Sequence, residues 1–192
     1  MNIAARAKNI LLNPQDEWRV IRGETSSAGD LLRHYVAPLA AIPALAGFIG
    51  SAMVGGHVLG VSVRTGVIGA LAMAVVTYVL NFVAVFLLAL TIDWLAPKFK
   101  SKPNQALAFK LAVYGWTPAW LGGVFQIIPS LSPLGFLAAL YAGYLIYVGV
   151  QELMATPAEE AAMYTVVVMV AVFVMLAVIG AIMHGGMGIG MY

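Results

Sequence analysis

The sequence predicts an all-α, polytopic integral membrane bundle of five transmembrane helices, and three observations carry this prediction. Of the 192 residues, 62% are hydrophobic and only 9% are charged, whereas soluble domains carry about 25% charged residues. The mean hydropathy is +0.94. Several intervals without a charged side chain are long enough to cross a hydrocarbon core about 30 Å thick. We therefore expect one bundle with no separate soluble domain.

Residues 1–27 are expected to form short amphipathic helices at the membrane interface. In residues 3–11 the apolar side chains share one helical face, and Arg6 and Lys8 lie off that face. Such a helix rests on a membrane surface with its apolar side toward the lipid. The pair Asn13-Pro14 then predicts the start of a second helix, with asparagine as the N-cap and proline at the first helical position.

Residues 28–183 are expected to form the transmembrane domain. The charge-free interval 111–151 would be about 60 Å long as one helix, so it must fold back at the proline-rich segment 129–133. The glycine-rich residues 184–192 are expected to form a flexible tail. The predicted spans are residues 31–55, 65–92, 106–128, 133–150 and 160–183.

Small residues recur every four positions in the third and fourth predicted spans. This spacing lets two helices approach closely, and the connection between the two spans is short. We therefore expect these spans to form a tight antiparallel hairpin. The small residues are Gly115, Ala119 and Gly123 in one span and Gly135, Ala139 and Gly143 in the other.

The basic residues predict the orientation. Nine of the ten Lys and Arg residues fall in segments on one side of the membrane, and only Arg64 falls on the other. Because basic loops remain on the cytoplasmic side, we expect a cytoplasmic N-terminus and an exoplasmic C-terminus in a bacterial inner membrane. Trp18 and Trp94 are expected in an aromatic belt at the cytoplasmic interface.

Polar residues inside the predicted spans form the candidate intramembrane site. They are Asn81, Thr77, Tyr114, Thr117 and Pro118. Asn81 and Thr77 share one face of the second span, and hydrogen bonding between helices is the favoured role for them. A path for a solute or an ion is the alternative. The Thr117-Pro118 pair weakens the helix and is used both for kinks and for ligand sites.

Asp93 ends the second predicted span, where a carboxylate meets the unfavourable end of the helix dipole. We therefore expect a basic partner, Lys98 or Lys110, in an interfacial ion pair; a proton or cation relay is the alternative. The remaining basic residues near the cytoplasmic side are expected to contact lipid headgroups. These are Arg6, Lys8, Arg19, Arg22, Lys100 and Lys102.

Several function classes are not expected. The chain has no cysteine, which excludes thiolate metal sites and cysteine nucleophiles. No pair of histidines with metal-ligand spacing and no nucleotide-binding or catalytic motif occurs in the sequence. We expect no catalytic activity, no metal and no cofactor. A net charge of +2 does not indicate nucleic-acid binding. The expected partners are membrane lipids and other membrane proteins or further copies of this chain.

Four segments in this order resemble the bacterial branch of the Yip family, five-span proteins named for their interaction with Ypt/Rab GTPases. The segments are Asn13-Pro14-Gln15-Asp16-Glu17-Trp18, the proline-bearing residues 35–43, Gln105-Ala106-Leu107 and Tyr114-Gly115-Trp116-Thr117-Pro118. The resemblance implies a five-span fold. In eukaryotes it implies roles in membrane traffic through a longer cytosolic N-terminal region and partner membrane proteins.

The favoured function is a non-enzymatic membrane-organising or scaffold role, in which the N-terminal segment and the basic loops contact lipids and partner proteins. The alternative is a small-solute or ion transporter or channel. In that alternative, Asn81, Tyr114 and Thr117 line a path between the kinked first and third spans.

Overall fold

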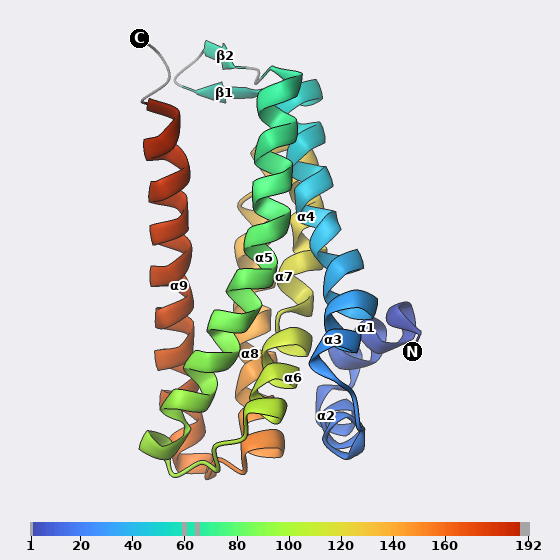
Figure 1. The fold of residues 1–192 in the computed structure, drawn as a ribbon, viewed down its shortest axis with the longest axis vertical. Coiled ribbons are helices and arrows are strands. Elements are labelled where there is room, and N and C mark those ends of the chain that lie inside the picture. The colour runs from blue at the N-terminus through green and yellow to red at the C-terminus, as the bar shows by residue number, and fades with distance from the viewer. Residues whose placement is uncertain (1, 59–60, 64–65, 189–192) are drawn as a thin grey trace.

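The chain forms long helices that run side by side and alternate in direction (Figure 1). The structure, a computed structural model, describes residues 2–58, 61–63 and 66–188. Two N-terminal helices, α1 (Ile3–Leu12) and α2 (Pro14–Gly23), lie beside the lower half of the bundle. The connections that follow α5 and α8 lie at the same end (Figure 1).

The first long helical stretch runs from Ala28 to Val54. It consists of α3 (Ala28–Leu31), the π-helical turn η1 (Leu32–Val36), α4 (Ala37–Ile49) and the π-helical turn η2 (Gly50–Val54). Pro38 and Pro43 lie within this stretch. Each lacks the amide proton that an α-helical bond requires, yet the helix continues past both, with a π-helical turn before Pro38.

A small hairpin joins this stretch to the next helix. Its strands, β1 (Gly56–Val58) and β2 (Val61–Val63), are antiparallel, with Gly56 opposite Val63. The sequence did not predict these strands, and Arg64 lies outside the described residues. Helix α5 (Val67–Leu95) follows and ends in the 3₁₀ turn η3 (Ala96–Phe99). Lys100 then takes a left-handed conformation, with φ of 54°, which stops the helix.

The third predicted span is a broken helix. It comprises α6 (Gln105–Gly115), α7 (Thr117–Gly122) and the 3₁₀ turns η4 (Gly123–Ile127) and η5 (Pro129–Leu131). The break lies at Trp116, immediately before the Thr117-Pro118 pair. Helix α8 (Leu134–Met154) runs back beside α7, and α9 (Ala158–Gly188) is the last element.

Helix α9 continues through residues 184–188, where the sequence suggested a flexible tail. Each added residue of an established helix gains a hydrogen bond, and a glycine costs only about 1 kcal/mol relative to alanine. The glycines therefore do not stop the helix at Met183. Residues 189–192 lie outside the described part of the chain.

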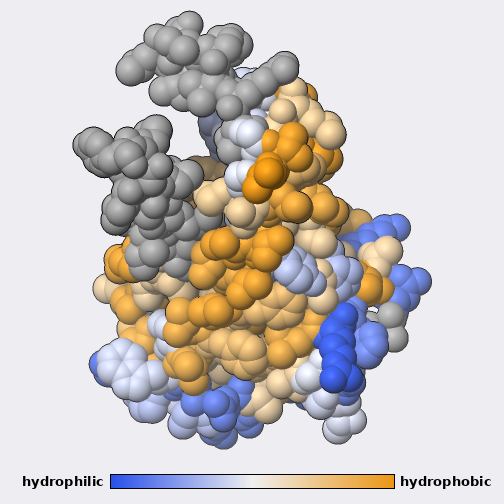
Figure 2. Space-filling model, turned by 45° about the horizontal axis from the view of Figure 1, so that its top comes forward, coloured by the Kyte–Doolittle hydropathy of each residue, from blue (hydrophilic) through white to orange (hydrophobic). Residues whose placement is uncertain are grey.

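The prediction of an all-α membrane bundle is confirmed. Four helical stretches among the described residues are long and apolar enough to cross a membrane: Ala28–Val54, Val67–Phe99, Leu134–Met154 and Ala158–Val178. The predicted third span is not among them, because it is broken at Trp116. The count of five spans stays a prediction. Figure 2 shows hydrophobic residues across the middle of one face and hydrophilic residues along its lower edge.

Close approach between α7 and α8 confirms the predicted hairpin, but other residues make the closest contact. A Cβ atom on Gly122 would lie 2.4 Å from the Cβ of Ala138. Gly123 instead lies against α4, where a Cβ atom would be 2.6 Å from the Cβ of Pro43. Gly143 faces Met169 of α9. The small residues thus bring α7 and α8 close to each other and to the helices on either side.

Candidate functional site

Helix α2 packs into the bundle through Trp18. The side chain of Trp18 is fully buried, and its indole N–H donates a hydrogen bond of 3.2 Å to the Leu145 carbonyl in α8. The ring lies against Gly149, where an added Cβ atom would be 2.9 Å from it. The aromatic-belt prediction is therefore wrong for Trp18, because Gly149 leaves a space on α8 that this ring fills. Trp94 is 67% exposed, as a belt residue would be.

Side chains of the bundle cap the C-terminal ends of both N-terminal helices. The Tyr141 hydroxyl donates a hydrogen bond of 2.6 Å to the carbonyl of Leu11. The buried Lys110 ammonium donates 3.1 Å to the carbonyl of Ile21 and donates also to the carbonyl of Glu24. Such carbonyls lack partners within their own helix, and a cation there also suits the helix dipole. The N-terminal segment is therefore part of the bundle.

A buried ion-pair cluster joins α1 to α2 and to the segment after α2. The Arg6 guanidinium contacts the carboxylates of Glu17 and Glu24. Burial alone would lower the pKa of Arg6, but the hydrogen bond to Glu24 and the charges of both carboxylates raise it above its usual value. Arg6 was predicted to contact lipid headgroups, and the structure turns it inward because two carboxylates surround it.

A chain of polar contacts extends from this cluster into the bundle. The Arg6 guanidinium lies 5.6 Å from the centre of the Tyr114 ring, in cation–π geometry. Pro118 cannot donate to the carbonyl of Tyr114, and the Thr117 hydroxyl donates to that carbonyl instead, at 2.7 Å. Since a threonine hydroxyl has one proton, the buried Tyr35 hydroxyl is the donor in its 2.8 Å bond to Thr117.

Asn81 belongs to a second polar group. Its amide nitrogen donates to the Thr77 carbonyl one turn earlier, at 2.8 Å, and its amide oxygen accepts the indole N–H of Trp120 at 2.8 Å. Asn81 thereby links α5 to α7. The predicted polar residues thus form two groups, one around Asn81 and one around Thr117. The hydrogen bonds of Asn81 and those of Thr117 involve different residues.

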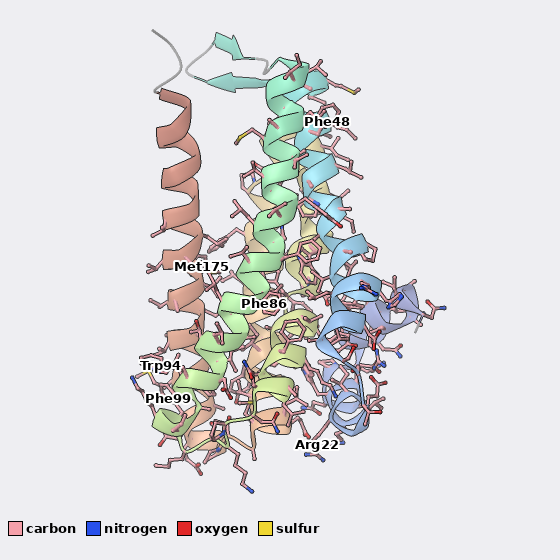
Figure 3. All side chains as sticks on the ribbon, viewed as in Figure 1. Arg22, Phe48, Phe86, Trp94, Phe99 and Met175 are labelled. Atoms are coloured by element: carbon pink, nitrogen blue, oxygen red, sulfur yellow. The ribbon has the colours of Figure 1, made fainter. Side chains whose placement is uncertain are left out.

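The ion pair predicted for Asp93 is not formed within the described ranges. Lys110 lies against the carbonyls at the end of α2, and the Lys98 ammonium lies 3.7 Å from the centre of the Trp94 ring. One Asp93 carboxylate oxygen is buried without a hydrogen-bond partner in that part of the chain. Phe99, below Trp94 in Figure 3, stacks on Tyr164 of α9 with 4.9 Å between the ring centres.

The remaining predicted headgroup residues lie in α1, in α2 and in the connection that follows α5. Arg19 and Arg22 pair with Glu152 of α8, with N–O distances of 3.5 and 3.7 Å; Figure 3 shows Arg22 at the lower end of the molecule. Lys100 pairs with Glu160 at 2.6 Å, and the hydrogen bond to that carboxylate raises the pKa of Lys100. Lys8 and Lys102 are exposed, and neither forms an ion pair with any described residue.

Sequence reasoning missed three residues of this site: Glu17, Glu24 and Tyr35. Glu17 and Glu24 lie too far from Arg6 along the chain for a helical spacing to link them. The signal for Tyr35 was available, because its hydroxyl lies in a predicted span and a buried hydroxyl needs a hydrogen-bond partner. Within the described ranges, no three His, Asp or Glu residues come together as metal ligands.

Comparison with known proteins identifies the family. A family model of the Yip1 domain matches residues 8–180. The inner membrane protein YohC of Escherichia coli strain K12 is 31% identical over 156 residues, which cover 77% of this chain and 78% of YohC. YohC of Escherichia coli O6:H1 strain CFT073 matches equally. No solved structure matches the chain. From these matches and the apolar helical bundle, we conclude that the chain belongs to the Yip1 family and is an integral protein of the inner membrane.

Proposed function

We propose that this protein is a non-enzymatic membrane-organising protein that acts as a scaffold or adaptor. Its working surface is the end of the bundle that carries the N-terminal helices. We define the cytoplasmic platform as the exposed residues of α1 and α2 together with residues 100–104 and 155–160. The platform presents charges of both signs, including the exposed Lys8 and Lys102. Such a surface suits lipid headgroups and polar faces of partner proteins.

The observation that carries this proposal is that four polar side chains inside the bundle bond to one another in pairs, Asn81 with Trp120 and Tyr35 with Thr117. Asn81 holds α5 to α7, and Thr117 bridges Tyr35 and the carbonyl that proline leaves free. Such bonds join transmembrane helices and compensate for proline breaks. The intramembrane residues therefore have a structural role, and the exposed charges remain for interactions.

The arrangement of cavities also favours a scaffold over a transporter. A cavity of about 240 Å³ lies between α4, α5 and η4 and is lined by Thr77 and Gln126. A second, of about 490 Å³, lies beside Arg6 and Tyr114. Along the predicted third span, Thr117 and Trp120 lie between Tyr114, which lines the second cavity, and Gln126, which lines the first. These two residues and Tyr35 are at most 1% exposed. A transport path would have to pass this packed layer.

Site-specific photo-crosslinking in cells tests the proposal. A photoreactive amino acid replaces Lys8 or Lys102 on the platform, and matched controls replace the lipid-facing Val83 of α5 or Val166 of α9, which are 43% and 56% exposed. We expect discrete protein adducts from the two platform positions and none from the two controls. Absence of adducts at both platform positions, or the same adducts at all four positions, would contradict an adaptor role.

A further inference from the structure

We propose that the bundle holds a phospholipid of the cytoplasmic leaflet, with an amine-bearing headgroup, in a composite site centred on Ser26. Two cavities share this residue. A polar pocket of about 490 Å³ is lined by Arg6, Gly23, Glu24, Thr25, Ser26 and Tyr114. An apolar groove of about 360 Å³ extends from Ser26 along α5 and α6. The inference deepens the proposed organising function and rests on it for its biological meaning.

The groove has the composition and position of an acyl-chain site. Apart from Ser26 and Gln105, its lining is apolar and comes from α3, α5 and α6, with Phe86 and Phe109 as the largest side chains. The Phe86 and Phe109 rings lie 5.2 Å apart. Phe86, in the lower half of α5 (Figure 3), is 44% exposed, and Leu90 is 50% exposed. The groove therefore borders the lipid-facing surface, from which a chain can enter.

Ser26 supplies an unsatisfied hydrogen-bonding group where the two cavities meet. Its hydroxyl oxygen is buried and has no partner among the described residues. A buried hydroxyl without a partner is costly, so an occupant that offers an oxygen at this point gains a hydrogen bond. In a glycerophospholipid, the phosphate and ester oxygens lie between the headgroup and the chains. Placing them beside Ser26 directs the acyl chain into the groove and the headgroup into the polar pocket.

The charges of the pocket select the headgroup. Arg6 is already paired with two carboxylates and its side chain is only 11% exposed, whereas the Glu24 side chain is 33% exposed. The most accessible charge is therefore a carboxylate, which attracts an ammonium group. The hydroxyls of Thr25 and Ser26 can donate to the phosphate. This combination fits phosphatidylethanolamine and disfavours phosphatidylglycerol, whose headgroup has no cation to pair with Glu24.

Native mass spectrometry of the full-length protein, delipidated in detergent, tests the proposal. Phosphatidylethanolamine and phosphatidylglycerol of identical chains are added in separate titrations. We expect a saturable phosphatidylethanolamine complex, and Ala89→Trp, which fills the groove, should weaken it by about tenfold or more. Val83→Trp on the same helix, outside the groove, should bind as the unmodified chain does. Ser26→Ala should weaken binding without lowering the melting temperature, since it removes a buried hydroxyl that has no partner among the described residues, and so guards against a folding defect in Ala89→Trp.

Equal binding by the unmodified chain and both groove variants would overturn the proposal, as would a preference for phosphatidylglycerol. The failure of this site and that of the proposed function are distinguishable. Retained phosphatidylethanolamine binding with no adducts at positions 8 and 102 would contradict the organising function and leave the lipid site standing. Discrete adducts at those positions with no lipid selectivity would overturn the lipid site alone.

Discussion

Replacing Trp18 with alanine is expected to release α1 and α2 from the bundle and to lower the free energy of unfolding by about 3–5 kcal/mol, as large-to-small core substitutions do. The ring is fully buried and donates to the Leu145 carbonyl. It also contacts Tyr114 edge-on, with ring centres 6.5 Å apart. Alanine removes the ring that fills the slot of α8 beside Gly149, so the docking of α2 loses its central contact.

Thermal unfolding in detergent and limited trypsin digestion measure this effect. The melting temperature should fall, and cleavage after Arg19 and Arg22 should become faster, because undocked helices are accessible to protease. The matched control is Trp94→Ala, whose ring is 67% exposed, and it should leave cleavage in α2 unchanged. Equal effects of the two tryptophan substitutions would contradict the docked position of α2.

Replacing Arg6 with methionine is expected to destabilise the protein by about 3–5 kcal/mol, the range found when one partner of a buried ion pair is removed. The Glu17 side chain is 10% exposed, and its carboxylate would be left without its cation. Glu24 would lose the same partner, but it is a third exposed, so water compensates for more of its loss. The substitution therefore acts mainly through Glu17.

A double variant separates the charge from the packing. Arg6→Met combined with Glu17→Met should recover much of the lost stability, because paired apolar replacements of a buried ion pair are often neutral. Lys8→Met is the matched control in the same helix, at an exposed position, and should change stability by less than about 0.5 kcal/mol. If Arg6→Met were as mild as Lys8→Met when the melting temperatures are compared, the buried cluster would be refuted.

Composition and charge spacing were sufficient to predict the helical membrane bundle, since apolar length is a local property of the sequence. The break at Trp116 could be anticipated from Thr117-Pro118 for the same reason. The hairpin of α7 and α8 was predicted, but its closest contact involves Gly122 and Ala138. A four-residue spacing identifies a helix with small residues and leaves open which of them face the neighbouring helix.

The docking of the N-terminal helices could not be predicted from local patterns. An amphipathic helix has the same sequence pattern whether its apolar face meets lipid or protein. For α2, the space that Gly149 leaves for the Trp18 ring favours contact with protein. Likewise, Arg6 was expected to contact lipid headgroups and Lys110 to pair with Asp93, because the partners that the structure gives them lie in segments distant along the chain. Contacts between distant segments depend on how the helices pack, and the sequence pattern of a single helix does not reveal that packing.

The proposed scaffold function requires that the polar residues inside the bundle close it and that its interactions occur at the platform. Single cysteines placed in this cysteine-free chain test both requirements. Asn81→Cys and Thr117→Cys are compared with Lys8→Cys and Lys102→Cys after a membrane-impermeant thiol reagent is applied from each side. We predict that positions 8 and 102 react from the cytoplasmic side and that positions 81 and 117 react from neither. Reaction at 81 or 117 at the rate of the platform controls would contradict the first requirement and favour a transport path.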